Sequence, residues 1–130
     1  HERLLRDQNT KLPLGPYDAR NFALCFSCHD AKLASSPSAT RFRDGDRNLH
    51  EVHLQPGERS RGCAACHSVH AEGQPRLIGK TVNFEGSGWA MPMGFSVTPE
   101  GGRCGSGCHE AQEYSRKPGG ARPTKNGGAP

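Results

Sequence analysis

The sequence predicts a mostly irregular fold with short α-helices and few or no strands, wrapped around a core that its aliphatic side chains do not supply. Only 19 of the 130 residues are Leu, Ile, Val or Phe, below the ~20% of ordinary globular chains. Gly and Pro contribute 17 and 10 residues, which favours turns over long elements. Burial gains roughly 25 cal/mol per Å², whereas ordering costs about 1–2 kcal/mol per residue. With 6 Cys and 7 His, the chain therefore needs disulfides, bound metal or an attached cofactor as its core.

The cysteines form three close pairs, and each pair is followed at once by a histidine. Two thiols one short turn apart can reach the two vinyl groups of a porphyrin, and the next residue can place its imidazole under the iron. The C-x-x-C-H pattern is therefore typical of c-type haem attachment, and the sequence predicts three haem c groups, each with its iron. The predicted attachment and proximal residues are Cys25, Cys28, His29, Cys63, Cys66, His67, Cys104, Cys108 and His109.

The third motif departs from this spacing, because Gly105-Ser106-Gly107 separates its cysteines. We expect one residue to bulge out there, since glycine can adopt backbone angles forbidden to other residues. Two other uses of the cysteines explain less. A Cys₄ zinc site formed by the first two pairs leaves the third pair and all three histidines unexplained. Three disulfides are disfavoured because closely spaced cysteines close no long loops.

Three proximal histidines leave His50, His53 and His70 as the predicted distal ligands, with His1 left over. A short helix is predicted around His50 and His53, with Asn48 as its N-cap and Pro56-Gly57 as its stop. Residues at i and i+3 share one helix face and cannot clamp both faces of one macrocycle, so His50 and His53 would bind different haems. By the same argument His70 serves a haem other than that of His67. We expect His70 at the first haem, with His50 and His53 divided between the other two in an order that the sequence leaves open.

Met91 and Met93 are the other soft groups that could bind iron. They alternate with Trp89 and Phe95 at every second residue, which favours packing from one face of an extended segment over ligation.

We expect a single three-haem domain over residues 1–130. The longest helix is predicted from Cys108 to about Lys117, and residues 71–103 are expected to be mostly extended or irregular. Asp18 is the expected cap of a short helix that carries the first motif. The predicted segments are an extended arm (1–17), a paired two-haem module (18–79), a third-haem segment (80–117) and a Pro/Gly tail (118–130).

The charge pattern argues against a nucleic-acid partner. The net charge is +4, but Lys and Arg are interleaved with Asp and Glu, so nucleic-acid binding is not expected.

No run approaches the ~20 apolar residues of a membrane helix, so no transmembrane segment is predicted. A first residue other than Met, without a leader pattern, suggests a processed, exported chain in the periplasm or outside the cell. Neutralisation of haem propionates is one possible use of Arg41, Arg43, Arg61 and Arg103, and solvated surface charge is the other.

Three segments resemble multihaem c-type cytochromes with the doubled CXXCH motif: Leu24-Cys25-Phe26-Ser27-Cys28-His29-Asp30, Asn48-Leu49-His50-Glu51-Val52-His53, and Cys63-Ala64-Ala65-Cys66-His67-Ser68-Val69-His70. The resemblance implies a small cytochrome wrapped around a haem stack, with bis-histidine irons and an electron-transfer function. Some relatives polymerise into extracellular filaments, so the expected partners are other redox proteins or copies of this chain. The alternatives are a small multihaem reductase with one open iron and a zinc-binding interaction module.

Overall fold

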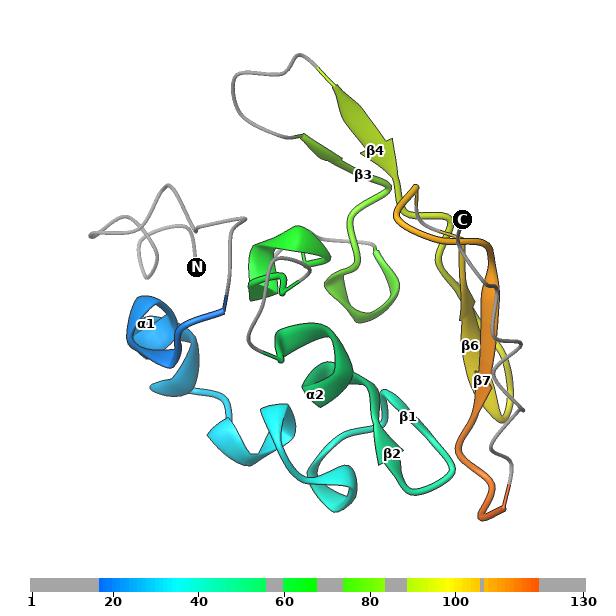
Figure 1. Ribbon diagram of the computed structural model, residues 1–130, viewed down its shortest axis with the longest axis horizontal. Coiled ribbons are helices and arrows are strands. Elements are labelled where there is room, and N and C mark those ends of the chain that lie inside the picture. Colours follow the sequence, from blue (N-terminus) through cyan, green and yellow to red (C-terminus); the bar gives the residue numbers. More distant parts are fainter. Residues whose placement is uncertain (1–16, 56–59, 68–73, 84–88, 106, 120–130) are drawn as a thin grey trace, which may run out of the picture.

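The computed structural model describes residues 17–55, 60–67, 74–83, 89–105 and 107–119. The chain runs from short helices into small sheets (Figure 1). The six-residue helix α2 (Leu49–Leu54) lies near the middle of the view, with the other N-terminal helices beside and below it. The C-terminal strands stand on the opposite side of α2 from α1 (Ala23–Phe26) (Figure 1).

The helices are short, and their starts follow from local capping chemistry. The Asp18 carboxylate accepts the Arg20 N–H at the start of η1, which leads directly into α1 and the first motif. The Asn48 side-chain oxygen Oδ1 accepts the N–H groups of His50 and Glu51, so Asn48 is the N-cap of α2, as the sequence predicted. The 3₁₀ helices are η1 (Ala19–Phe22), η2 (Ala31–Ala34), η3 (Pro37–Ala39), η4 (Cys63–Ala65) and η5 (Pro75–Leu77).

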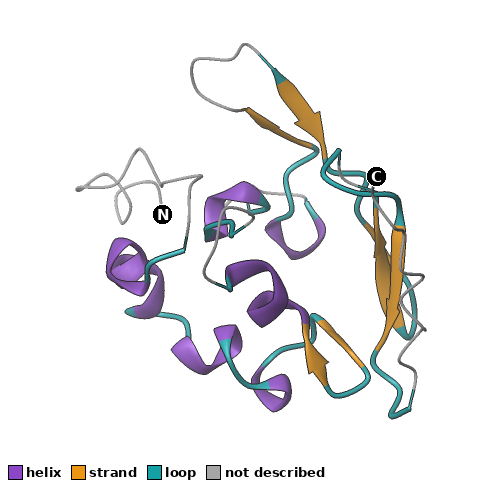
Figure 2. Ribbon diagram, in the orientation of Figure 1, coloured by secondary structure: helices purple, strands orange, loops and turns teal. Residues whose placement is uncertain are grey.

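The strands form three small antiparallel sheets, shown in orange in Figure 2. A two-stranded sheet immediately before α2 pairs β1 (Arg43–Asp44) with β2 (Arg47–Asn48). A second hairpin pairs β3 (Thr81–Asn83) with β4 (Ala90–Pro92), with Val82 opposite Met91. The largest sheet has the order β5 (Ser96–Val97), β6 (Gly101–Cys104) and β7 (Gln112–Ser115).

The prediction of a mostly irregular helical fold with few or no strands is wrong, because the described residues contain seven short strands. The helix predicted from Cys108 to Lys117 is also wrong, since Gln112–Ser115 is strand β7. The reason lies in β6, where two glycines leave room for the neighbouring strand. A Cβ on Gly101 would stand 1.7 Å from the Tyr114 carbonyl oxygen, and a Cβ on Gly102 would stand 2.6 Å from the Tyr114 hydroxyl oxygen. The close packing of Tyr114 against β6 outweighs the local helix propensity of residues 108–117.

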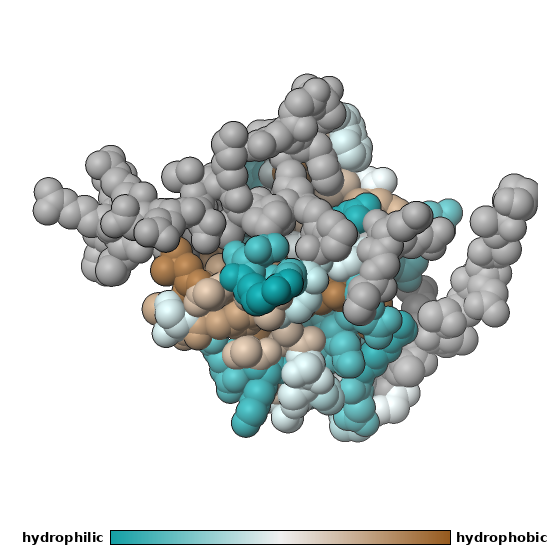
Figure 3. Space-filling view, turned by 60° about the vertical axis from the view of Figure 1, so that its left-hand side comes forward, coloured by the Kyte–Doolittle hydropathy of each residue, from teal (hydrophilic) through white to brown (hydrophobic). Residues whose placement is uncertain are grey.

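The aliphatic core is small, as the composition implied. The buried hydrophobic side chains of the described residues are Phe22, Ala65, Val82, Met91 and Met93. Met91 and Met93 pack with Val82 against Cys66 and Ile78, which confirms that the two methionines pack, whereas Trp89 is 50% exposed. Apolar and hydrophilic residues share the face shown in Figure 3.

Two sets of hydrogen bonds connect α2 to the rest of the chain. The buried Asn48 amide donates to the Leu33 carbonyl oxygen at 3.0 Å, which joins the start of α2 to η2. On the other side, Gly45 N–H donates to the Ser115 carbonyl oxygen at 2.7 Å, and Ser115 N–H donates to the Asp44 carboxylate at 3.0 Å. The hairpin before α2 is therefore attached to β7. No helix within these described ranges is long and apolar enough to cross a membrane.

Candidate haem-binding site

The first two cysteine motifs fold into the same turn. In the first motif, His29 N–H donates to the Cys25 carbonyl oxygen at 2.8 Å. In the second motif, His67 N–H donates to the Cys63 carbonyl oxygen at 3.0 Å. The two stretches are far apart in sequence, so the shared turn follows from the C-x-x-C-H spacing itself.

The third motif is built differently. Cys104 ends strand β6, whereas Cys108 and His109 lie in the turn that leads toward β7. Gly105 does not have a positive φ, so the expected use of glycine for a forbidden backbone angle is wrong at that residue. Gly107 serves close packing instead, because a Cβ there would lie 3.1 Å from Met91 Cγ. Ser106 lies outside the described residues.

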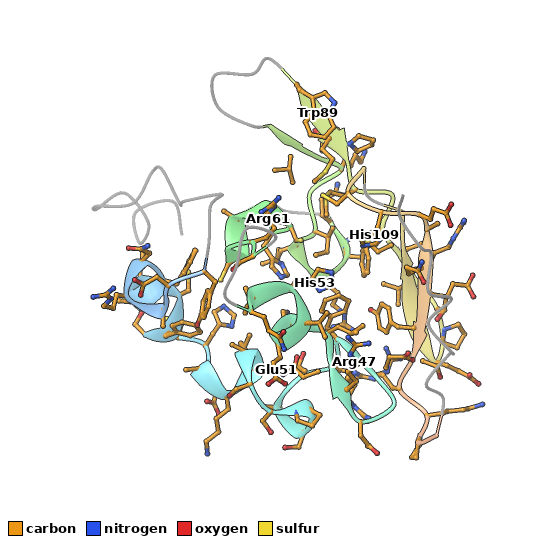
Figure 4. All side chains as sticks on the ribbon, in the orientation of Figure 1. Arg47, Glu51, His53, Arg61, Trp89 and His109 are labelled. Carbon is orange, nitrogen blue, oxygen red and sulfur yellow. The ribbon has the colours of Figure 1, made fainter. Side chains whose placement is uncertain are left out.

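The structure brings four of the predicted histidine ligands together as two pairs. The ring centroids of His50 and His67 are 6.3 Å apart, with 25° between the ring planes. The ring centroids of His53 and His109 are also 6.3 Å apart, with an interplanar angle of 43°. His53 and His109 reach toward the same region from α2 and from the third motif, whereas Glu51 points away from them (Figure 4). Each pair joins one α2 histidine to one histidine that follows a cysteine motif.

This separation is the one that two imidazoles need when they bind opposite sides of one metal ion. A metal–nitrogen bond is about 2 Å long. The centre of an imidazole ring lies about 1.1 Å beyond its bonding nitrogen, so two ligands in line across a metal have ring centres about 6 Å apart. Stacked rings in direct contact would be closer. The centroid separation of each pair therefore matches that of two imidazoles bound to one metal ion.

The other ring nitrogen of each histidine already has a partner. The Nδ1 atoms of His53, His67 and His109 lie 2.7, 3.1 and 2.7 Å from backbone carbonyl oxygens, those of Leu49, Arg76 and Glu110 respectively. The Nδ1 atom of His50 lies 3.0 Å from the Thr40 hydroxyl oxygen. A carbonyl can only accept, so Nδ1 is the donor in those three rings, and in the neutral ring Nε2 is then the nitrogen with the free lone pair. Metal-binding histidines commonly have such an Nδ1–H partner.

The two pairs differ in burial, and burial changes the pKa of the histidines in the His50–His67 pair. Burial, and then the charges of the neighbouring His67 and His53, lower the pKa of His50 to about 4. Burial also lowers the pKa of His67, against the opposing effect of its hydrogen bond to the Arg76 carbonyl oxygen. Both imidazoles of this pair are therefore kept neutral, which is the form that binds metal. His109 is exposed.

The cysteines place the second motif between the other two. Burial, and then the charge of Cys25, raise the pKa of Cys63 to about 11. Burial, and then the charges of Cys104 and Cys108, raise the pKa of Cys66 to about 11. The second motif thus faces the first motif through Cys63 and the third motif through Cys66. None of the six cysteines is joined to another in a disulfide.

The remaining predicted ligands are less fully placed. His29 is exposed, and its ring acts electrostatically on His67, so the first and second motifs are neighbours at their histidines too. His70 and His1 lie outside the described residues. Of the arginines proposed for propionates, Arg43 and Arg61 donate to the carbonyl oxygens of Gly45 and Ser60, whereas Arg41 and Arg103 are exposed.

Sequence reasoning missed an aromatic residue at the centre of this arrangement. The Phe42 ring lies edge-on to His50 at 5.1 Å, stacks on His53 at 5.8 Å and meets Tyr114 edge-on at 5.2 Å. It therefore orients both α2 histidines and connects them to β7. A lone aromatic residue six positions before a capping Asn was the available signal.

Comparisons with protein families, with curated proteins and with solved structures find no match for this chain. Within the described ranges no three or more His, Cys, Asp or Glu side chains gather as a metal-holding group. The histidine arrangements are two-ligand pairs, which is the number of axial ligands that a six-coordinate haem iron takes from a protein.

Proposed function

We propose that this chain is an electron carrier that holds three covalently attached c-type haems. The observation that carries the proposal is the presence of two histidine pairs at the same 6.3 Å ring separation, each containing the histidine of a cysteine motif. The Nδ1 partners of all four rings support it further, because they leave Nε2 for iron.

The proposed residue roles follow from this pairing. Cys63 and Cys66 would attach the second haem, with His67 and His50 as its axial ligands. Cys104 and Cys108 would attach the third haem, with His109 and His53 as ligands. Cys25 and Cys28 would attach the first haem, with His29 as proximal ligand and His70 as the proposed distal ligand. Two axial imidazoles leave an iron no open position for a substrate, which favours electron transfer over the reductase alternative.

A bound haem supplies a one-electron redox couple. The residues of this chain contribute the ligands, their orientation and the exclusion of water. The neutral, half-buried His50 and His67 provide a site at which protons compete weakly for the imidazoles. The packed pair Met91 and Met93 lies against Cys66, and Met91 Sδ lies 3.2 Å from the Cys108 sulfur, so the second and third sites share an apolar wall.

The zinc alternative fits the cysteines less well. A Cys₄ zinc site needs thiolates. A zinc site formed by the first two cysteine pairs would leave the third pair, and the two histidine pairs, without a role. Thioether attachment to haem uses all three cysteine pairs and the histidine that follows each one.

The test is a haem count on the full chain, matured in a host that attaches c-type haem. Intact-mass spectrometry should show three covalent haems, and the reduced protein should show low-spin c-type bands. A colourless protein that binds zinc would overturn the proposal. High-spin signal at one haem, with rapid binding of added cyanide, would favour the reductase.

Electrons must enter and leave such a carrier, so we also propose other redox proteins or further copies of this chain as its partners. Negative-stain electron microscopy of concentrated holoprotein distinguishes them. Filaments would support self-assembly, and a uniform monomer would count against it.

A further inference from the structure

Thr40 differs from every other group that contacts the Nδ1 atom of these four histidines, because it is a side chain. His53, His67 and His109 have backbone carbonyls as partners, and no single substitution removes a carbonyl. His50 has the Thr40 hydroxyl at 3.0 Å. The surroundings of this one imidazole can therefore be changed by a single substitution.

The Thr40 hydroxyl is itself held in place. Its oxygen accepts the Phe42 N–H at 3.0 Å and lies 3.0 Å from His50 Nδ1. A hydroxyl oxygen has two lone pairs, so it can also accept the Nδ1 proton that His50 would carry when Nε2 binds iron. Thr40 is half-buried and extended, with φ −130° and ψ 148°, at the end of η3. The Phe42 ring meets the His50 ring edge-on at 5.1 Å. The Thr40–Phe42 segment therefore holds the His50 ring by a hydrogen bond and an aromatic contact.

We propose that Thr40 is a positioning residue that sets the orientation and ligand strength of His50, and thereby the reduction potential of the second haem alone. This inference rests on the proposed function. An acceptor for Nδ1–H makes an imidazole a stronger ligand. A stronger ligand stabilises ferric iron more than ferrous iron, so the wild-type hydroxyl lowers the potential of its own site.

The experiment compares holoprotein variants by spectroelectrochemistry and by low-temperature EPR. Thr40→Val removes the acceptor while keeping the branched shape of the side chain. We expect the oxidation equilibrium of one haem to shift toward the ferrous form by up to about tenfold, which is 59 mV for a one-electron couple. The low-spin EPR signal of that haem should move as well, while the other two haems stay unchanged.

Two further variants separate positioning from general destabilisation. Thr40→Ser keeps the hydroxyl and should restore the wild-type potential and EPR signal. Thr98→Val is the matched control, because the Thr98 hydroxyl accepts the Gly101 N–H at 2.9 Å, away from the four paired histidines. It should leave all three potentials in place even if it lowers the melting temperature.

Three unmoved potentials in a fully loaded Thr40→Val protein would overturn the role of Thr40, as would an equal shift of all three. If Thr40→Val loads haem poorly, proton NMR of the wild-type holoprotein decides, since the His50 Nδ1 proton should exchange slowly with water. Fast exchange at His50 would overturn the inference. Wild-type protein without haem would instead overturn the proposed function itself.

Discussion

The His50–His67 pair and the His53–His109 pair have the same ring separation but different surroundings. Both contain one histidine from α2, and both measure 6.3 Å between ring centroids. The first pair is half-buried, and its His67 comes from a motif that begins on a helical turn. The second pair contains the exposed His109, which comes from a motif that begins on a strand. One six-residue helix therefore contributes a histidine to each pair, while the segment that supplies the second histidine determines the solvent access and ring angle of the pair.

Removing the cysteines of the second motif should have the largest effect, because that motif faces both of the others. In Cys63→Ser/Cys66→Ser we expect haem content to fall from three to below one per chain. In Cys104→Ser/Cys108→Ser we expect two haems to remain. Intact-mass spectrometry of purified holoprotein measures both. Equal losses in the two variants would remove the distinction between a central and a peripheral site.

Breaking the sheet that carries Cys104 should disturb the His53–His109 site selectively. Gly101→Ala would place a Cβ against the Tyr114 carbonyl oxygen, where only backbone movement can relieve the overlap. We expect at least about 2 kcal/mol of destabilisation and a high-spin component at one haem.

Gly105→Ala is the control for this substitution. Its Cβ would meet the Ala111 side chain at an ordinary 3.6 Å, so near-wild-type stability is expected. Thermal melts and visible spectra compare the two variants, and an equal loss in both would contradict the explanation from β6–β7 packing.

The two histidine pairs should also differ in their sensitivity to acid. The pKa of folded His50, at about 4, lies below its ordinary value of 6.5, so its neutral form is favoured in the folded protein. The resulting stability is fully present above about pH 6.5 and is lost as the pH falls toward 4, at a total of about 3 kcal/mol. His109 is exposed to solvent, so we expect the pair that contains it to lose its low-spin spectrum at a higher pH than the half-buried His50–His67 pair. A stepwise titration followed in the visible region tests this order, and simultaneous loss would contradict it.

The smallest expected effect is spectroscopic. The two pairs differ in interplanar angle, 25° against 43°, and the relative orientation of axial imidazole planes affects the splitting of iron d orbitals. Ferric holoprotein should show distinguishable low-spin EPR signals for these sites. His53→Met should remove one of them and leave the signal of the His50–His67 site unchanged. Loss of both signals together would show that the sites are not independent.

The motif turns and the helix caps could be predicted from the sequence, because they depend on contacts between residues that are close along the chain. The turn in each C-x-x-C-H motif is closed by a hydrogen bond between residues four apart, and the caps Asp18 and Asn48 act on residues two or three positions away. Such contacts are encoded within a few residues, so spacing alone predicted them. The i, i+3 placement of His50 and His53 likewise required two different partners before any fold was known.

Long-range packing decided what spacing left open. His50 could be matched with His67, and His53 with His109, only once α2 lay between the second motif and the β5–β6–β7 sheet. Residues 112–115 form a strand because Gly101 and Gly102, more than ten residues before Tyr114, leave space for Tyr114 to pack closely against β6. Contacts of this kind depend on how distant segments meet, so local pattern reading predicted a helix there, and tertiary packing replaced it with a strand.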